Sequence, residues 1–455
     1  MLKLGKSPHR AIKRMQEDAG GGMLAAWFGD YYTIFVSDPL LAKEMWGKQF
    51  MNFSDRKHKP IGRVLSGGYK NLISADYEKW KPLRAMVSNT FTKTKLKALI
   101  SIIEEQVSLL TKKMDDCMAT GQPFYPAKYC KKFSMNITLM ICFSKQIPYE
   151  ESVEGGVLDH LIHPIETIFE ASAQGKLLHA FKWAAPLVVH VLSKKIANAH
   201  ATIHKYIRTI YDEKLTTMDP TNPRDLFEEI VNSDGKAEDL DTVIGVAIDL
   251  LLAGTDTSES TIEWAMLYMC NFPDIQEKLH AELASVIGVG NKVELSHRAQ
   301  TPYTVAFIKE VLRIRPIAPF GLNRTNQQEA TIGGYFIPQG TQLLINIYGI
   351  HHNPKYWPNP EQLIPERFLN QENVTNDNWI PFGIGQRNCV GLNLAMDEIY
   401  MAVANISLKY KLKSATGETI SDAETYRLTL HPVAYGMTLE SRGGVSSTPV
   451  ANQRA

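Results

Sequence analysis

The residue of this sequence most suited to chemistry is Cys389, which lies in a glycine-rich stretch running from Pro381 to Gly391. Three glycines in so short a stretch exclude a regular helix or strand. Apolar residues from Leu392 to Leu408 then recur at helical spacing and predict a helix. Cys389 is therefore expected at a helix N-terminus, where unpaired amide groups and the helix dipole stabilise a thiolate. A thiolate of depressed pKa can serve as a nucleophile or as a metal ligand.

The surroundings of Cys389 distinguish between these uses. A nucleophilic cysteine needs a histidine partner, and none lies within thirty residues, although the fold could supply one. Zinc needs three or four ligands, so a single thiolate fits haem iron better. Phe382 can cover the sulfur, and Arg387 offers a forked donor to a nearby carboxylate. A buried cysteine in a glycine-rich turn, without chemistry, is the alternative.

A second group of chemically useful residues lies inside the longest predicted helix, residues 239–272. Gly254 is unfavourable there by up to about 1 kcal/mol relative to alanine, and such departures are expected at functional sites. Gly254 leaves room for a flat ligand, and Thr257 can bond a carbonyl one turn back. Asp256 supplies an ionisable proton carrier beside it. A kinked, buried helix without chemistry is the alternative.

Two further pairs lie at helical spacing. Trp80 and Arg84 are four residues apart, and Glu310 and Arg313 are three apart, so each pair shares a helix face. Taken alone, the first pair is typical of a surface arginine packed on a tryptophan. The second is typical of an exposed ion pair that contributes little to stability.

Together these motifs resemble the cytochrome P-450 family of haem-thiolate monooxygenases, and most closely its eukaryotic microsomal type. Phe382 to Gly391 matches the haem-ligand signature Phe-Gly-X-Gly-X-Arg-X-Cys-X-Gly. Ala253 to Ser258 matches the oxygen-activation motif Ala/Gly-Gly-X-Asp/Glu-Thr-Thr/Ser. The two pairs match the family's Trp-X-X-X-Arg and Glu-X-X-Arg motifs, and Arg367 matches the arginine that joins the latter behind the haem.

The resemblance implies a mainly α fold with small β-sheets. One domain, residues 1–440, would hold haem b (iron protoporphyrin IX) between the long central helix and the Cys-ligand helix. Residues 441–455 are polar and are expected to be disordered. Cys389 would be the metal ligand, and Asp256 and Thr257 the catalytic proton donors. The implied cofactor-binding residues are Trp80, Arg84, Ala253, Gly254, Arg324, Phe382, Arg387, Cys389 and Gly391.

The resemblance also implies that one atom of O2 is inserted into a hydrophobic small-molecule substrate. Electrons would come from a separate NADPH-dependent reductase or another donor protein, because no GxGxxG fingerprint follows a strand. A lysine cluster is a candidate docking surface for an acidic donor, although a solvated face explains it equally: Lys79, Lys81, Lys93, Lys95 and Lys97. Alternatives are a thiolate-haem isomerase or dehydratase, which departs from the Thr257 motif, and a haem-binding sensor.

Composition narrows the setting. The net charge of +1 gives no reason to expect nucleic acid as a partner. Five cysteines without a CxxC pair indicate free thiols in a reducing compartment. No apolar run reaches the eighteen residues that a membrane-spanning helix needs. Microsomal members of the family carry an N-terminal membrane anchor, and the sequence as written shows none. We therefore expect an intracellular, cytoplasmic protein, or one associated with the endoplasmic reticulum if an anchor is missing from this sequence.

The remaining expectations concern the predicted loops, helices and strands and the candidate substrate contacts. Residues 54–75 read as a flexible loop that in the family closes over substrate, and His351-His352 as an exposed loop pair. Leu177 to Val189 is predicted to be core, with a substrate lid or shallow membrane contact as alternatives. Further helices are predicted at 8–18, 40–47, 77–88, 96–118, 131–145, 156–172, 273–286 and 304–315, and strands at 23–28, 31–36, 334–338 and 341–348. Candidate substrate contacts are Ile317, Ala318, Phe320, Val433 and Ala434.

Overall fold

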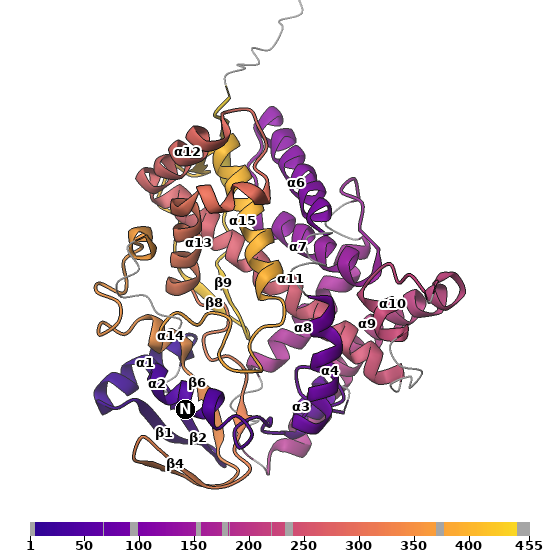
Figure 1. Ribbon diagram of the computed structural model, residues 1–455, viewed down its shortest axis with the longest axis vertical. Coiled ribbons are helices and arrows are strands. Elements are labelled where there is room, and N and C mark those ends of the chain that lie inside the picture. Colours follow the sequence, from indigo (N-terminus) through magenta and orange to yellow (C-terminus); the bar gives the residue numbers. More distant parts are fainter. Residues whose placement is uncertain are drawn as a thin grey trace, which may run out of the picture.

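The computed structural model describes residues 5–66, 68–91, 99–151, 156–174, 181, 183–219, 221–232, 240–369 and 377–443. They form a large helical body and a smaller β-rich part beside α1 and α2, at the lower left of Figure 1. The helices are α1 (Pro8–Ala19), α2 (Pro39–Lys43), η1 (Glu44–Lys48), α3 (Pro60–Leu65), α4 (Tyr77–Thr90), α6 (Ile100–Thr120), α7 (Pro126–Phe143), α8 (Val157–Gln174), α9 (Ala185–Thr217), α10 (Leu226–Asn232), α11 (Leu240–Asn271), α12 (Pro273–Ile287), η3 (Leu295–Gln300), α13 (Pro302–Ile314), α14 (Ile347–His351), η4 (Pro365–Phe368) and α15 (Leu392–Lys409).

The strands are short. They are β1 (Met23–Phe28), β2 (Tyr31–Val36), β3 (Arg324–Thr325), β4 (Ala330–Ile332), β5 (Tyr335–Ile337), β6 (Gln342–Ile345), β7 (Tyr410–Ser414), β8 (Glu424–Tyr426), β9 (Leu430–Pro432) and β10 (Met437–Ser441). The predicted mainly α fold with small sheets is confirmed. No described helix is long and apolar enough to cross a membrane.

The largest sheet joins two N-terminal strands to two strands from residues 324–345, in the strand order β1-β2-β6-β3. The hairpin β1–β2 is antiparallel, as predicted, and β2 then pairs in parallel with β6, with Thr33 opposite Gln342. Strand β3 closes the sheet, with Arg324 opposite Leu343. A candidate cofactor residue is thus fixed by a sheet whose first strands lie near the N-terminus.

Helix α11 runs through the centre of the helical body and contacts α7, α15, α12 and α13 (Figure 1). Apolar residues cover most of its circumference, so it is buried along most of its length. Its C-terminal half belongs to the largest core cluster, together with residues of α7, α13 and α15. The helix predicted at 239–272 is therefore confirmed as the central element.

The Glu-X-X-Arg pair is buried, and is therefore not the exposed ion pair that its spacing alone would indicate. Arg313 donates from Nε and Nη2 to the two Glu310 oxygens at 2.7 and 2.8 Å, and neither side chain is exposed to solvent. Arg367 of η4 adds a third contact, with Nε 3.2 Å from Glu310 Oε1. The remaining Arg313 donors reach backbone carbonyls, among them those of His351 and Pro360. This buried triad ties α13 to the loops that follow α14.

The predicted exposure of His351-His352 is wrong, because both side chains are fully buried. His351 ends the short helix α14, and its Nε2 accepts the Ile380 amide at 2.9 Å. Burial, assisted by the neighbouring Arg313, lowers the pKa of His351 to about 3. This histidine is therefore a neutral acceptor that anchors the chain just before the Cys389 loop.

The apolar stretch that ends at Val189 is largely exposed where it is described, although Ala184 within it is buried. Trp183 and Leu187 are 76% and 61% exposed, beside the start of the long helix α9. Residues 175–180 and 182 lie outside the described residues. Burial needs a packing partner that local hydrophobicity cannot reveal, and Trp183 and Leu187 lack such cover.

Two segments expected to lack helices and strands are the loop 54–75 and the C-terminal tail. The predicted loop 54–75 contains the short helix α3, which begins at Pro60. Near the C-terminus, β10 ends at Ser441, and Arg442 pairs with Glu277 at 2.8 Å. Residues 444–455 lie outside the described residues.

Replacing Glu310 by Ala should lower the free energy of unfolding by about 3–5 kcal/mol, since it leaves Arg313 buried without its counter-charge. Chemical denaturation followed by circular dichroism measures the change. The matched control is Glu440→Ala, which breaks the exposed pair with Lys413 (2.5 Å) and should change stability by less than about 1 kcal/mol. Equal effects of the two substitutions would contradict a structural role for the buried triad.

Candidate active site and cofactor site

The Cys389 loop is a closed turn held by its own backbone. The Cys389 amide donates to the Phe382 carbonyl at 2.9 Å, and the Asn388 amide to the Gly385 carbonyl at 3.1 Å. Helix α15 starts directly afterwards, and its first turn is closed by the bond from the Ala395 amide to the Gly391 carbonyl at 2.8 Å. The loop therefore presents Cys389 at the N-terminus of α15, as the sequence predicted.

The electrostatics of Cys389 differ from the sequence expectation. Burial of the thiol raises its pKa, although the Gly391 amide and the Arg84 guanidinium act in the opposite direction. The helix N-terminus thus favours the thiolate as expected, but desolvation outweighs it. The residue as a whole is nevertheless exposed to solvent.

Gly385 is required by a close approach between the Cys389 loop and η1. Its φ is +77°, a region that favours glycine. A Cβ atom on Gly385 would lie 2.9 Å from the carbonyl carbon of Trp46 and closer still to its oxygen. The loop is therefore packed backbone to backbone against the end of η1.

The motif at the centre of α11 faces accessible space. Ala253 is exposed, and Gly254 and Thr257 are half-buried, whereas their neighbours along the helix, Leu252 and Thr255, are buried. Thr257 Oγ1 donates to the Ala253 carbonyl at 2.9 Å, the predicted bond one turn back, while α11 remains continuous.

The structure gives a different reason for glycine at 254. A Cβ atom there would lie 2.6 Å from Thr138 Oγ1 of α7, so the missing side chain serves the packing of α7 on α11. A flat ligand is therefore not needed to explain this glycine.

Asp256 is held by two residues that sequence reasoning missed. Thr429 Oγ1 donates to Asp256 Oδ2 at 2.6 Å, and His431 Nε2 lies 3.2 Å from the same oxygen. Burial raises the pKa of Asp256, but His431 and Thr429 outweigh it and the net pKa is lowered. Asp256 is therefore ionised. No sequence signal could have revealed these partners, because they lie about 170 residues away on the β8–β9 hairpin.

Buried arginines gather beside the Cys389 loop. Arg387 stacks over Trp80 at 4.6 Å and donates from Nη2 to the Ala75 carbonyl at 2.7 Å, but its Nε and Nη1 have no partner. Burial and the nearby Arg387 lower the pKa of Arg324 to about 9. Arg84 donates to the Asn388 carbonyl at 2.7 Å, which ties α4 to the loop.

This arginine cluster fits an anionic ligand. Burial lowers the pKa of Arg387 to about 10, so its charge is poorly compensated. Within the described part of the chain, no carboxylate forms an ion pair with Arg84, Arg324 or Arg387. The propionates of a haem would supply that charge and accept the free donors of Arg387. Arg56 is a further member that the sequence did not reveal: burial, together with like-charge repulsion from Arg324 and Arg387, lowers its own pKa.

The candidate substrate positions are dispersed. Ile317 is buried and its carbonyl accepts the Leu430 amide at 2.9 Å, whereas Val433 is 46% exposed. Phe320 instead packs on Phe35 of β2 at 5.3 Å, in the N-terminal sheet cluster. Phe320 is thus explained by sheet packing alone.

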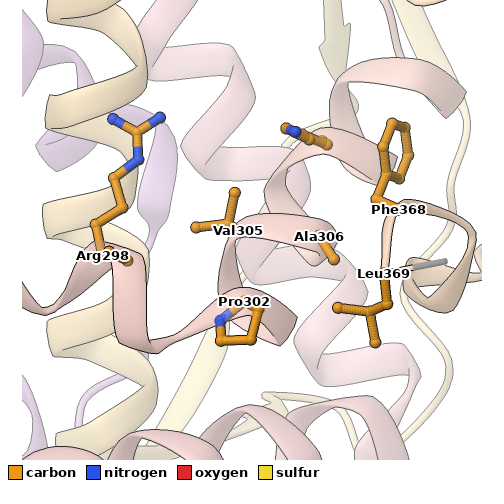
Figure 2. Close-up of a pocket in the computed structure, with 8 residues that line it drawn as sticks. Arg298, Pro302, Val305, Ala306, Phe368 and Leu369 are labelled. Atoms are coloured by element: carbon orange, nitrogen blue, oxygen red, sulfur yellow. The ribbon is translucent and has the colours of Figure 1, made fainter. Parts of the chain in front are cut away.

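A surface pocket lies apart from these groups. It has a volume of about 250 Å³, and Figure 2 shows it between η3, α13 and the end of η4. None of the predicted site residues lines it. Its lining residues are Arg298, Ala299, Pro302, Val305, Ala306, Lys309, Phe368 and Leu369.

Comparison with known proteins decides the family. The family model "Cytochrome P450" matches residues 1–439. The chain belongs to the cytochrome P450 family. "Probable cytochrome P450 508A1" of Dictyostelium discoideum is 37% identical, with 97% of this chain and 90% of the relative covered. "Probable cytochrome P450 519E1" of the same organism is 34% identical, with 96% and 91% covered.

The fold comparison agrees. A solved structure of a zebra fish cytochrome P450 with progesterone has a TM-score of 0.84 and 25% identity, and covers 96% of this chain and 99% of that chain. The predicted family, fold and cofactor are confirmed: this cytochrome P450 is a haem-thiolate monooxygenase that uses haem b. Membership also implies O2, an organic substrate and an electron donor as partners.

Gly385→Ala should abolish correct assembly of the Cys389 loop, because the new methyl group collides with the Trp46 carbonyl. We expect loss of haem incorporation, measured as the ratio of haem to protein absorbance after purification. Gly383→Ala is the matched control: its φ is +78°, but the nearest atom, Asn388 Cα, is 3.9 Å away. That substitution should cost only the backbone strain of about 1–2 kcal/mol. Equal haem loss in both variants would contradict the steric explanation.

Proposed function

We propose that this cytochrome P450 oxygenates an apolar small molecule with electrons from a separate donor protein, and that Cys389 is its axial haem ligand. The observation that carries the assignment is the position of Cys389, which is exposed at the N-terminus of α15, a helix that contacts α11. Ser258, next to Thr257, donates to buried Glu398 of α15 and so links the two helices at this level.

Residues of the Cys389 loop, of α4, of β3 and of α11 are proposed to hold the haem. Arg84, Arg324, Arg387 and Trp80 would bind the propionates, since they supply buried positive charge and free donors. Phe382 and Gly391 would border the sulfur, and Ala253 and Gly254 the opposite face. Bound haem supplies the redox chemistry by which one oxygen atom of O2 enters the substrate and the other becomes water.

Asp256 and Thr257 are proposed to deliver the protons. The Thr257 hydroxyl lies on the accessible face of α11, while the Asp256 carboxylate lies on its buried side and is held there by Thr429 and His431. A threonine hydroxyl can receive a proton from one side and donate it on the other. Because Asp256 is ionised at rest, its carboxylate would first take up a proton and then resupply it to Thr257.

The donor protein is proposed to dock on the face that carries Lys79 and Lys81. Both side chains are exposed on α4, and Gln386 of the Cys389 loop is exposed as well. Because α4 is joined to this loop through Arg84 and Asn388, the lysines lie on an element close to the sulfur. Lys93, Lys95 and Lys97 lie outside the described residues. An acidic surface on an NADPH-dependent reductase would complement this charge.

A membrane contact is proposed at the start of α9. Trp183, Leu187 and Val191 are 76%, 61% and 64% exposed, and their spacing by four residues places them on one side of this segment. Such a face suits shallow insertion below lipid headgroups. Substrate entry from a lipid phase would be consistent with an apolar substrate.

Cys389→Ser should abolish the strongly red-shifted Soret band that the dithionite-reduced protein gives with carbon monoxide, because the thiolate ligand is lost. Absorption spectra with and without carbon monoxide measure it. Cys142→Ser, at a buried cysteine of α7, is the control and should keep the band. Persistence of the shifted band in Cys389→Ser would overturn the assignment of the ligand.

Thr257→Ala should lower the product formed per electron pair by at least about tenfold and release hydrogen peroxide, since positioned proton transfer contributes about 10²–10⁴-fold. Product and peroxide are measured in a reconstituted system with a reductase. Thr261→Ala, one turn further, removes a hydroxyl that bonds the Thr257 carbonyl at 2.9 Å, and should leave coupling unchanged. Unchanged product with no need for a reductase would instead indicate an isomerase, and unchanged haem-ligand binding without turnover a sensor.

Reversing charge at Lys79 and Lys81 to Glu should slow reduction of the haem by the reductase at least about tenfold at low ionic strength, and weaken its salt dependence. Stopped-flow absorption under carbon monoxide measures the rate. Lys413→Glu is the control, because this residue follows the far end of α15, about 27 Å along the helix. An unchanged rate in the double variant would remove this surface from consideration.

A further inference from the structure

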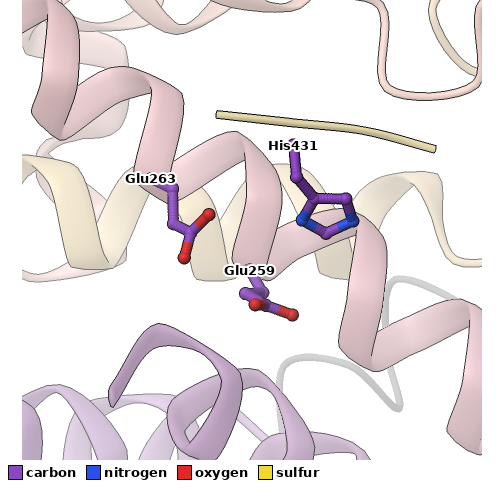
Figure 3. A group of neighbouring side chains, drawn as sticks. All are labelled: Glu259, Glu263 and His431. Atoms are coloured by element: carbon purple, nitrogen blue, oxygen red, sulfur yellow. The ribbon is translucent and has the colours of Figure 1, made fainter. Parts of the chain in front are cut away.

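A compact group of metal-binding side chains lies on the buried side of α11, beyond the residues assigned to oxygen chemistry. Glu259 and Glu263 are four residues apart and share a helix face, and His431 approaches them from β9. One ligand atom from each of these three residues lies within 4.8 Å of the others. Figure 3 shows the imidazole directed toward the two carboxylates from the neighbouring strand. Carboxylate and imidazole together form a ligand set that proteins use for divalent metals.

The carboxylates of this group are buried without sufficient partners. Glu259 is 1% and Glu263 3% exposed. Glu259 Oε2 and Glu263 Oε1 make no hydrogen bond, whereas Glu259 Oε1 is 3.4 Å from Lys131 Nζ. A buried acceptor without a partner costs about 1–3 kcal/mol, and more when it is charged. A positive species between the two glutamates, a metal ion or protons, would remove that penalty.

The orientation of His431 favours a metal ion. Its Nε2 lies 3.2 Å from Asp256 Oδ2 and 3.2 Å from Thr429 Oγ1, so that nitrogen is occupied. If Nε2 carries the proton and donates it to Asp256, Nδ1 has a free lone pair. Figure 3 shows the ring with a nitrogen on the side of the glutamates. A histidine that binds a metal through one nitrogen and donates to a carboxylate through the other is a recurrent arrangement.

The charge balance around the group points the same way. Lys131 of α7 also pairs with Glu166 of α8 at 2.9 Å, and Arg427 lies 3.4 Å from Glu166. The pKa values of Glu259, Glu263 and His431 are all raised, so protons occupy this group in the absence of a metal. Once a metal has displaced those protons, four carboxylates and two cations leave a net charge of minus two, which a divalent cation would cancel. The titratable side chains facing the group are Asp256, Glu259, Glu263, Lys131, Cys130, Glu166, Arg427, His431 and Tyr435.

We propose that Glu259, Glu263 and His431 form a binding site for a divalent first-row transition metal, best suited to Zn²⁺ and distinct from the haem iron. Atoms that bind zinc at about 2 Å lie roughly 3–4 Å apart, so a small side-chain rotation would complete the site. Glu259 would bind through Oε2, because Lys131 holds Oε1. The ion would fasten β9 to α11 beside Asp256, and water could fill the remaining coordination position.

The test is zinc binding by the haem-loaded protein. Chelator-treated protein is dialysed against micromolar Zn²⁺, and zinc per haem is measured by plasma mass spectrometry. We expect the double variant Glu259→Gln/Glu263→Gln to bind one zinc fewer than the parent protein, and each single variant to bind at least about tenfold more weakly. Glu418→Gln, an exposed glutamate, is the control and should bind as the parent does.

Asp256→Asn tests the orienting contact. Loss of a carboxylate that supports a ligating histidine should weaken zinc binding about 10–100-fold, while the two glutamates remain in place. The carbon monoxide band of each variant reports that the haem domain is intact. An Asp256→Asn variant that binds zinc as tightly as the parent would exclude His431 as an oriented ligand.

Zinc binding should also strengthen from pH 6 to pH 8. Burial raises the pKa of both Glu259 and Glu263 to about 8, so protons compete with the metal at lower pH and are released when it binds. At a surface site built from exposed histidines, most of the gain in affinity with rising pH would already be complete by about pH 7, because free histidines lose their protons near pH 6.5.

X-ray absorption at the zinc edge decides the matter even if a variant fails to fold. The parent protein should show nitrogen and oxygen ligands with a single imidazole and no sulfur. Two or more imidazoles, or equal zinc content in the parent and the double variant, would overturn the proposal and leave protons as the species between the glutamates.

Discussion

A helix that is buried along its length must find a partner for every polar side chain that it carries, and α11 carries many. Asp249 accepts from the Asn71 side chain at 2.6 Å and from the Ile73 amide at 2.8 Å. Further along, Ser260 and Trp264 both donate to the Leu430 carbonyl, at 2.6 and 3.1 Å. Unmade hydrogen bonds in the interior are expensive. The polar residues of α11 thus draw two distant segments of the chain, residues 71–73 and 429–431, toward the centre of the molecule.

The second organising constraint acts on the Cys389 loop, which is held from several sides at once. Its backbone packs against η1 at Gly385, and Arg84 donates a hydrogen bond to the Asn388 carbonyl. The segment that precedes the loop is anchored by the hydrogen bond from the Ile380 amide to His351. Because these contacts come from distant parts of the sequence, the sulfur has little freedom to move relative to α11. Precise placement of a ligand depends on such supporting contacts more than on the ligand itself.

The sequence allowed the family, the mainly helical fold and many of the helices to be predicted, because helical periodicity and the motif spacings are local properties. The long helix α9 and the strands β7–β10 were not predicted. The buried Glu310–Arg313 pair could be anticipated only through the resemblance, since spacing alone also describes an exposed pair. His351 was misjudged because burial depends on neighbours brought by the fold. The partners of Asp256 could not be predicted at all: hydrogen bonds between α11 and the β8–β9 hairpin are a product of tertiary structure.

The largest sheet has a consequence for how the chain folds. Thr33 pairs with Gln342, about 300 residues later in the chain. The edge of β2 that faces away from β1 therefore stays unpaired until β6 has been synthesised. At ribosomal speeds of about 5–20 residues per second, that interval lasts roughly 15–60 s. During it the apolar hairpin exposes a strand edge, a state prone to aggregation and to capture by chaperones. Arg324 is placed by the same sheet, so this part of the cofactor site is completed only after β6 has been synthesised.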